Sequence, residues 1–112
     1  MTKIEEKICS AVRHGTPMCR GNTSVTPMAD VNGFYMWLHG KPIALLCNGK
    51  LYLSDCGQAP RITSSRMNAV LDGLNLPFHV SVQGGKMQLE GRGKPIHFHQ
   101  CTINMTNVRV TE

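Results

Sequence analysis

The N-terminal segment has its apolar residues at helical spacing. These residues are Ile4, Ile8, Ala11 and Val12. Thr2 and Glu5, three positions apart, match a capping box, in which each residue bonds the backbone N–H of the other. Gly15 suits the left-handed residue after a helix. The pattern predicts a helix over residues 3–14.

From Asn22 to Asp55 the pattern changes to short strand-like runs separated by turn dipeptides. The runs are "NTSV", "FYMWL", "IALLC" and "KLYLS". Asn48 and Gly49 both tolerate positive φ and favour a two-residue type I′ turn. The segment therefore predicts an antiparallel meander. Its run "FYMWL" is apolar at successive positions, which is typical of a strand inside a sheet.

A second helical stripe follows the meander. Its apolar residues are Met67, Val70, Leu71 and Leu74. They predict a helix over residues 63–72, packed on the sheet, with Thr63 or Ser64 as N-cap and Gly73 left-handed after its end.

The C-terminal part returns to strand patterns. "FHVSV" and "KMQLE" flank Gly84 and Gly85 as a hairpin, and "TINMTNVRV" predicts one final strand. The expected fold is α+β: N-terminal helix, antiparallel β-meander, second helix packed on the sheet, and C-terminal antiparallel strands. The length of 112 residues, with 41% hydrophobic residues, predicts a single domain over residues 1–112.

The composition limits the cellular compartment and the kinds of chemistry that we expect of the protein. No apolar run reaches the length of a signal peptide or membrane span, so we expect a cytoplasmic protein without membrane contact. The five cysteines are odd in number and lack CxxC spacing, which indicates reduced thiols, most of them in the core. No GxSxG elbow, cysteine-protease signature or carboxylate pair stands out, so we expect a protein that is not an enzyme and has no cofactor.

The net charge of +5 is compatible with a polyanion or an acidic protein as partner. The serines and arginines of residues 61–66 fall at the start of the second predicted helix, where free N–H groups favour an anion; an ordinary cap with solvated arginines is the alternative. Residues 92–95, Arg-Gly-Lys-Pro, are a variant of the AT-hook core, or simply a solvated loop. The candidate residues for double-stranded nucleic acid are Arg61, Ser64, Ser65, Arg66, Lys86, Arg92 and Lys94. Aromatic residues are 5% and lie mostly in predicted strands, so no stacking platform for single strands is expected.

His97, His99 and Cys101 alternate in "KPIHFHQC", which on one strand would point three metal ligands to one face. A metal site, or a metal-dependent enzyme through His97 and His99, is a minority hypothesis. Exposed strand histidines are the leading interpretation.

The neighbouring apolar residues oppose one continuous strand. Ile96 and Phe98 occupy even positions, whereas Ile103 and Met105 occupy odd positions. A bulge or turn between Phe98 and Ile103 resolves the conflict, and a break before Cys101 removes it from the face of the two histidines.

The stretches "GNTSV", "LHGKPIA" and "SDCGQAPRITSSRMNAVL" resemble small domains encoded by tailed bacteriophages, over Gly21 to Leu71. That family has no assigned activity, so the resemblance implies a phage or prophage accessory protein in the bacterial cytoplasm and transfers no functional residues. We expect the protein to bind a host protein. Double-stranded nucleic acid is the alternative partner, and a homodimer formed by strand pairing stays open.

Overall fold

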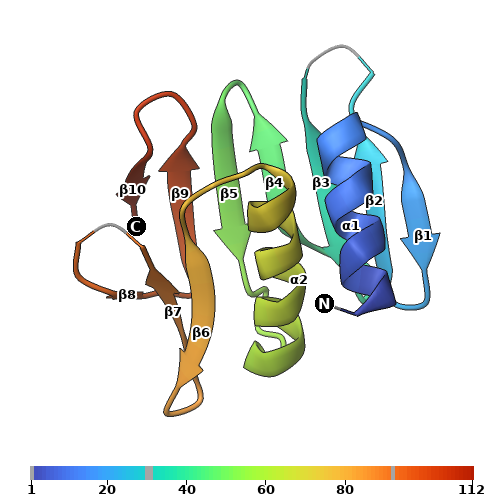
Figure 1. The fold of residues 1–112 in the computed structure, drawn as a ribbon. Coiled ribbons are helices and arrows are strands. Elements are labelled where there is room, and N and C mark those ends of the chain that lie inside the picture. Colours follow the sequence, from blue (N-terminus) through green and yellow to red (C-terminus); the bar gives the residue numbers. More distant parts are fainter. Residues whose placement is uncertain (1, 30–31, 92) are drawn as a thin grey trace.

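The computed structural model describes residues 2–29, 32–91 and 93–112, which form two helices and ten strands (Figure 1). The helices are α1 (Lys3–His14) and α2 (Pro60–Gly73). The strands are β1 (Met18–Arg20), β2 (Thr23–Pro27), β3 (Phe34–Leu38), β4 (Lys41–Cys47), β5 (Lys50–Ser54), β6 (His79–Gln83), β7 (Lys86–Glu90), β8 (Ile96–His97), β9 (Gln100–Asn104) and β10 (Arg109–Thr111). The predicted α+β class and element order are confirmed.

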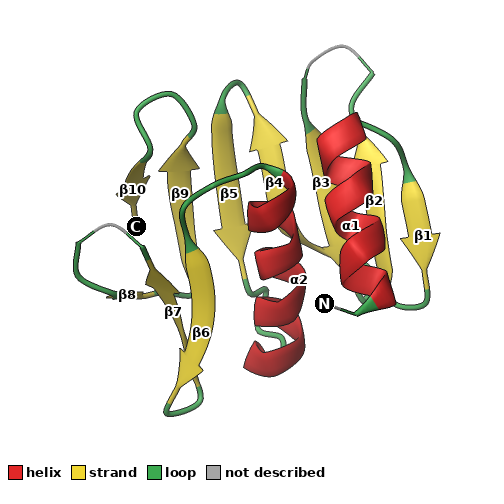
Figure 2. Cartoon of the chain, in the orientation of Figure 1, coloured by secondary structure: helices red, strands yellow, loops and turns green. Residues whose placement is uncertain are grey.

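The strands form two antiparallel sheets (Figure 2). The large sheet has seven strands in the order β1-β2-β3-β4-β5-β9-β10, and the small sheet has the order β6-β7-β8. In the large sheet, β9 lies next to β5 and extends the meander. The two strands are far apart in the sequence. Strand β3 lies between β2 and β4, as its apolar pattern predicted.

Two-residue turns close three of the hairpins. Asn48 and Gly49 have φ values of 52° and 74°, which confirms the expected type I′ geometry. His39-Gly40 and Gly84-Gly85 also have positive φ at both positions. These tight turns, with positive φ at both positions, therefore fix the register of the strands that follow.

Both helices lie on one side of the large sheet (Figure 1). The predicted first helix is confirmed, with its capping box and with Gly15 left-handed at φ 67°. Its buried residues meet α2, where the Cys9 thiol donates to the Ala69 carbonyl at 3.1 Å. Beneath the helices, the large sheet buries alternate residues such as Met36 and Leu53. The core is thus a layer between the sheet and the two helices.

The predicted N-cap of α2 is wrong. The helix begins at Pro60, whose fixed φ suits a first helical position, and Ala59 is the N-cap without a side-chain bond. The hydroxyl of Thr63 donates to the Ala59 carbonyl at 2.8 Å, and that of Ser64 donates to the Arg61 carbonyl at 2.9 Å. Both hydroxyls therefore bond inside the first turn.

The predicted left-handed role of Gly73 is also wrong. Gly73 ends α2, and the positive φ falls at Asn75. A Cβ at Gly73 would lie 3.0 Å from the carbonyl oxygen and 3.2 Å from the Cα of Cys9. Glycine is needed here because the backbones of α1 and α2 approach closely.

The final strand is not continuous, which corrects the prediction of one strand over "TINMTNVRV". The Asn104 side chain accepts hydrogen bonds from the backbone N–H of Thr106 at 2.9 Å and of Asn107 at 3.4 Å. This local bonding favours a turn over an extended strand. Strand β10 consequently folds back along β9.

One side chain joins α2 to the small sheet. The Asn68 amide donates to the Val80 carbonyl at 2.8 Å and accepts from the Val80 N–H at 2.6 Å. Because β6 is an edge strand, this side of Val80 has no neighbouring strand. Asn68 therefore supplies the pairing that a strand would give.

Replacing Gly73 with alanine is expected to destabilise the protein by about 1–3 kcal/mol, the range for overpacking a core. Helix propensity alone would favour alanine by about 1 kcal/mol, so the two effects have opposite signs. Urea unfolding measures the difference, and Asp72→Ala, on the exposed side of the same turn, is the control. A more stable Gly73→Ala protein would contradict the close approach.

Asn68→Ala should lower the free energy of unfolding by about 2 kcal/mol or more, because a buried backbone group left without a partner costs about 1–3 kcal/mol. Hydrogen exchange should show a faster Val80 amide in this variant. Unchanged exchange at Val80 would show that the side chain does not hold β6.

Candidate functional site

The predicted metal ligands are not gathered by the structure. The register break is confirmed: β8 ends at His97 and β9 begins at Gln100, so the break precedes Cys101. His97 is exposed, whereas Cys101 is 4% exposed and faces the core. Burial raises the pKa of the Cys101 thiol to about 12. Across residues 2–29, 32–91 and 93–112, no three His, Cys, Asp or Glu side chains are grouped to hold a metal ion.

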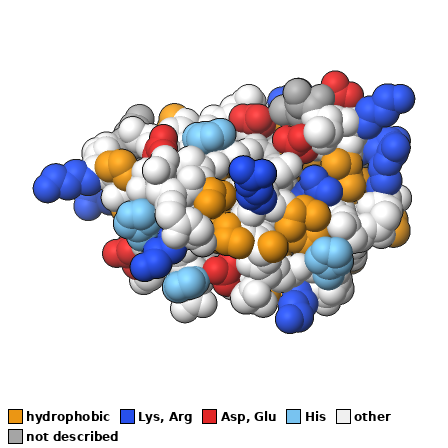
Figure 3. All heavy atoms as spheres, turned by 90° about the horizontal axis from the view of Figure 1, so that it is seen from below, with side chains coloured by type: hydrophobic (Ala, Val, Ile, Leu, Met, Phe, Trp, Pro, Cys, Tyr) orange, Lys and Arg blue, Asp and Glu red, His pale blue; other side chains and the backbone are white. Residues whose placement is uncertain are grey.

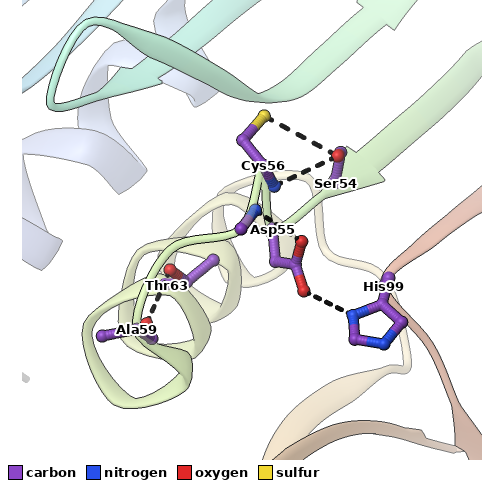
Figure 4. Close-up of polar contacts among 7 residues, drawn as sticks. Ser54, Asp55, Cys56, Ala59, Thr63 and His99 are labelled. Atoms are coloured by element: carbon purple, nitrogen blue, oxygen red, sulfur yellow. Dashed lines mark hydrogen bonds and ion pairs between the residues drawn. The ribbon is translucent and has the colours of Figure 1, made fainter.

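His99 instead bonds to the turn after β5 (Figure 4). Its Nδ1 lies 2.9 Å from Oδ2 of Asp55, and the imidazole is 87% exposed. The other carboxylate oxygen of Asp55 accepts from the Gly57 N–H at 2.9 Å. This pair ties the turn to the segment that leads into β9.

The nearest thiol does not join the pair. Cys56 points away from the His99 ring and donates to the Pro42 carbonyl at 3.1 Å (Figure 4). The backbone N–H of Cys56 bonds to the Ser54 hydroxyl at 3.3 Å. The cluster therefore orders a turn, without placing a nucleophile beside the histidine base.

The predicted anion site on α2 is largely engaged with the protein itself. The Arg66 Nε donates to Thr23 Oγ1 at 3.1 Å, and its Nη1 donates to Ser65 Oγ at 3.4 Å. Ser64 is 8% exposed, and its hydroxyl bonds within the helix. Arg61 is exposed.

The other basic candidates lie in the C-terminal half. Lys86 begins β7 beside the Gly84-Gly85 turn, and Lys94 is exposed in the loop before β8. Arg92 lies outside the described residues. Seen from below, lysine and arginine side chains lie among hydrophobic, histidine and acidic side chains (Figure 3). In that view several of the lysine and arginine side chains are grouped at the right-hand end, and the others lie singly.

A different surface combines aromatic and basic side chains. We call the side of the large sheet that faces away from α1 and α2 the open face. Strand alternation and register assign residues to it, since their neighbours on each strand are buried under the helices. The residues of the open face include Tyr35, Trp37, Leu45, Lys50, Tyr52 and Arg109.

The aromatic residues are divided between the open face and the core. The chain has one Trp and two Tyr, and all three lie on the open face. Its three Phe residues are all buried. Tyr35 and Trp37 stack with ring centroids 5.2 Å apart, and Tyr52 is 41% exposed. The open face therefore keeps the aromatics that also carry polar groups.

Strand register arranges these side chains in rows. Leu45 on β4 separates Tyr35 on β3 from Tyr52 on β5. The adjacent row contains Lys50 and Arg109, with Asn104 of β9 between them. None of the described strand residues facing outward from this sheet is Asp or Glu. The strands of the open face are thus aromatic, polar and positively charged.

Two hollows border the aromatic residues. One, of about 510 Å³, is lined by Trp37, Ser24 and the His39-Gly40 turn among others. The other, of about 260 Å³, is lined by residues that include Tyr52, Thr102 and Glu112. The face is therefore uneven at the scale of a small planar group.

Sequence reasoning missed this surface. It took the aromatic residues in strands as evidence against a stacking platform. The alternation in "FYMWL" contained the relevant signal, because Tyr35 and Trp37 share the parity opposite to Phe34, Met36 and Leu38.

The cysteines also differ from expectation. Only Cys9 and Cys101 are buried; Cys47 and Cys56 are half-buried and Cys19 is exposed, so the prediction that most lie in the core is wrong. None of the five forms a disulfide.

Comparison with known proteins gives one family. The family model described as Kyanoviridae Gp96 protein matches residues 1–106. No curated protein and no solved structure matches the chain. In the part of the chain that the structure describes, neither helix is long and apolar enough to cross a membrane.

Thiol labelling should separate Cys101 from Cys19. With a pKa of about 12, the Cys101 thiol would be ionised in roughly one molecule in ten thousand at pH 8. Peptide mapping by mass spectrometry after timed alkylation should show Cys19 modified first and Cys101 modified only as the protein opens. Equal rates at the two positions would contradict the burial of Cys101.

Proposed function

This chain belongs to the Kyanoviridae Gp96 protein family, a phage protein family, and from that premise we propose that it is an accessory protein that acts by binding in the infected host cell. The predicted phage resemblance is confirmed by the family match. The partner that it binds is a macromolecule, and the open face is the surface that holds it.

The observation that carries this proposal is the position of Trp37, Tyr35 and Tyr52. Each side chain combines a large apolar ring with a polar group, the type that is enriched where proteins meet their partners. Both helices lie on the other side of the large sheet (Figure 1). On the open face the Tyr52 ring is 41% exposed, and the Tyr35 and Trp37 rings are half-buried. A partner would cover apolar area that folding leaves in water.

Binding is better supported than catalysis. The arrangement closest to an enzyme site is the Asp55–His99 pair, whose imidazole is 87% exposed and whose neighbouring Cys56 thiol bonds elsewhere. Catalysis by proton transfer would need a nucleophile or substrate held at the free ring nitrogen. A host protein, the partner expected from the sequence, is one class of macromolecule that the open face would accommodate.

A comparison of variants in host lysate tests the proposal. Trp37→Thr with Tyr52→Thr removes two rings but keeps residues that favour strands. Material bound to the tagged protein, with protein and nucleic acid both measured, should fall at least tenfold. Lys3→Gln with Lys7→Gln, exposed changes on α1, is the control and should leave recovery unchanged.

Circular dichroism and thermal unfolding must first show that the ring variant folds. If it does not, Tyr52→Leu alone replaces it. Equal recovery by the folded variant and the wild-type protein would exclude the open face as the binding surface.

A further inference from the structure

We infer that the open face binds single-stranded nucleic acid, with bases stacked on Trp37 and Tyr52 and phosphates along the row from Lys50 to Arg109. This inference rests on the proposed function and names the chemistry of the partner.

The aromatic side chains of the open face are placed to stack with bases. Base stacking on aromatic side chains is tolerant of sequence, because each base offers a π-face. Tyr35, which stacks on Trp37, lies two strands from Tyr52, roughly 10 Å at the usual strand spacing. Trp37 extends the aromatic area along β3 and borders the larger hollow. The face thus offers separate stacking positions for more than one base.

The open face also carries positive charge beside the aromatic side chains. Lys50 and Arg109 occupy one row, and the Asn104 amide lies between them. These side chains offer two cations and a hydrogen-bond donor to a phosphate backbone. The row lies directly beside the aromatic row, two residues away along β5. Bases and phosphates would therefore meet different parts of the same surface.

Glu112 determines on which side of the aromatic row the phosphates would lie. Glu112 lines the hollow at Tyr52, together with Ser54 and Gln100, which lie beyond Tyr52 from Lys50. A phosphate would be repelled there and attracted at the opposite end of β5. The strand should consequently run across the sheet on the Lys50 side of the aromatic row.

The same observations disfavour other partners. A second copy packed face to face would bring two sets of lysine and arginine together with no acidic strand residue on either open face. In a duplex the bases are already paired and stacked, so their faces are closed to the protein. The chemistry fits an unpaired, negatively charged strand.

Binding is measured with fluorescein-labelled oligothymidine and oligouridine of about 16 nucleotides, the upper site size of a comparable single-strand-binding fold. The fluorescence anisotropy should rise with at least one of the two probes. Comparison of the two affinities shows whether the protein prefers DNA or RNA. The chain has a single Trp, so quenching of its fluorescence reports stacking at Trp37 directly. A duplex of the same length should bind more weakly than the preferred single strand.

Two sets of variants separate stacking from charge. Tyr52→Leu keeps apolar bulk but removes the ring, and should weaken binding about tenfold. Lys50→Gln with Arg109→Gln should reduce the slope of log affinity against log salt by about 1.4, since each single-strand phosphate contact contributes about 0.7. Lys3→Gln with Lys7→Gln removes the same charge from α1 and should leave the slope within error.

Specific results would overturn the inference. They are absence of Trp37 quenching at saturating probe, equal affinity of Tyr52→Leu and wild type, tighter binding of the duplex, or a dimer that quenches Trp37 without any probe. A different result would be a pull-down from lysate that recovers a protein which stays bound after nuclease treatment and is lost in the ring variant. That result would support the proposed function but would exclude nucleic acid as the partner.

Discussion

The close contact between α1 and α2 at Gly73 determines how the remaining structure is arranged. Because the backbones approach within van der Waals distance there, both helices fit side by side on one face of the large sheet. Asn68 then attaches the small sheet to α2 through the Val80 backbone. All elements outside the large sheet that bury apolar residues are committed to one side, and the opposite side stays in contact with water.

Local signals made much of this fold predictable. The capping box at Thr2 and the glycines of the hairpin turns act within a few residues, so the sequence determines them almost alone. Gly73 and Asn68 act through partners distant in sequence, and the reason for each appears only when Cys9 or Val80 is in place. The turn at Asn104 had local chemistry, but the apolar residues around it resemble a strand equally well.

The candidate site was predictable to a different degree. The change of parity from Ile96 and Phe98 to Ile103 predicted a break that separates Cys101 from the two histidines, because one continuous strand cannot expose and bury the same face. Parity also divided Trp37 and Tyr35 from their neighbours, but it could not tell which side the helices would cover. A sheet face is open or closed according to the packing of other elements, so the aromatic surface emerged only from the assembled layers.

The pairing of β5 with β9 has a consequence for the order in which the protein is made. Lys50 leaves the ribosome long before Asn104 and Arg109, and the loop that must close between the two strands includes α2 and the whole small sheet. Pairings of such long separation form late, because the chain entropy lost on closing the loop precedes any gain. A nascent chain that stops after α2 would contain the meander and Lys50 but neither Asn104 nor Arg109, so the row of cations is complete only after β10 has been made.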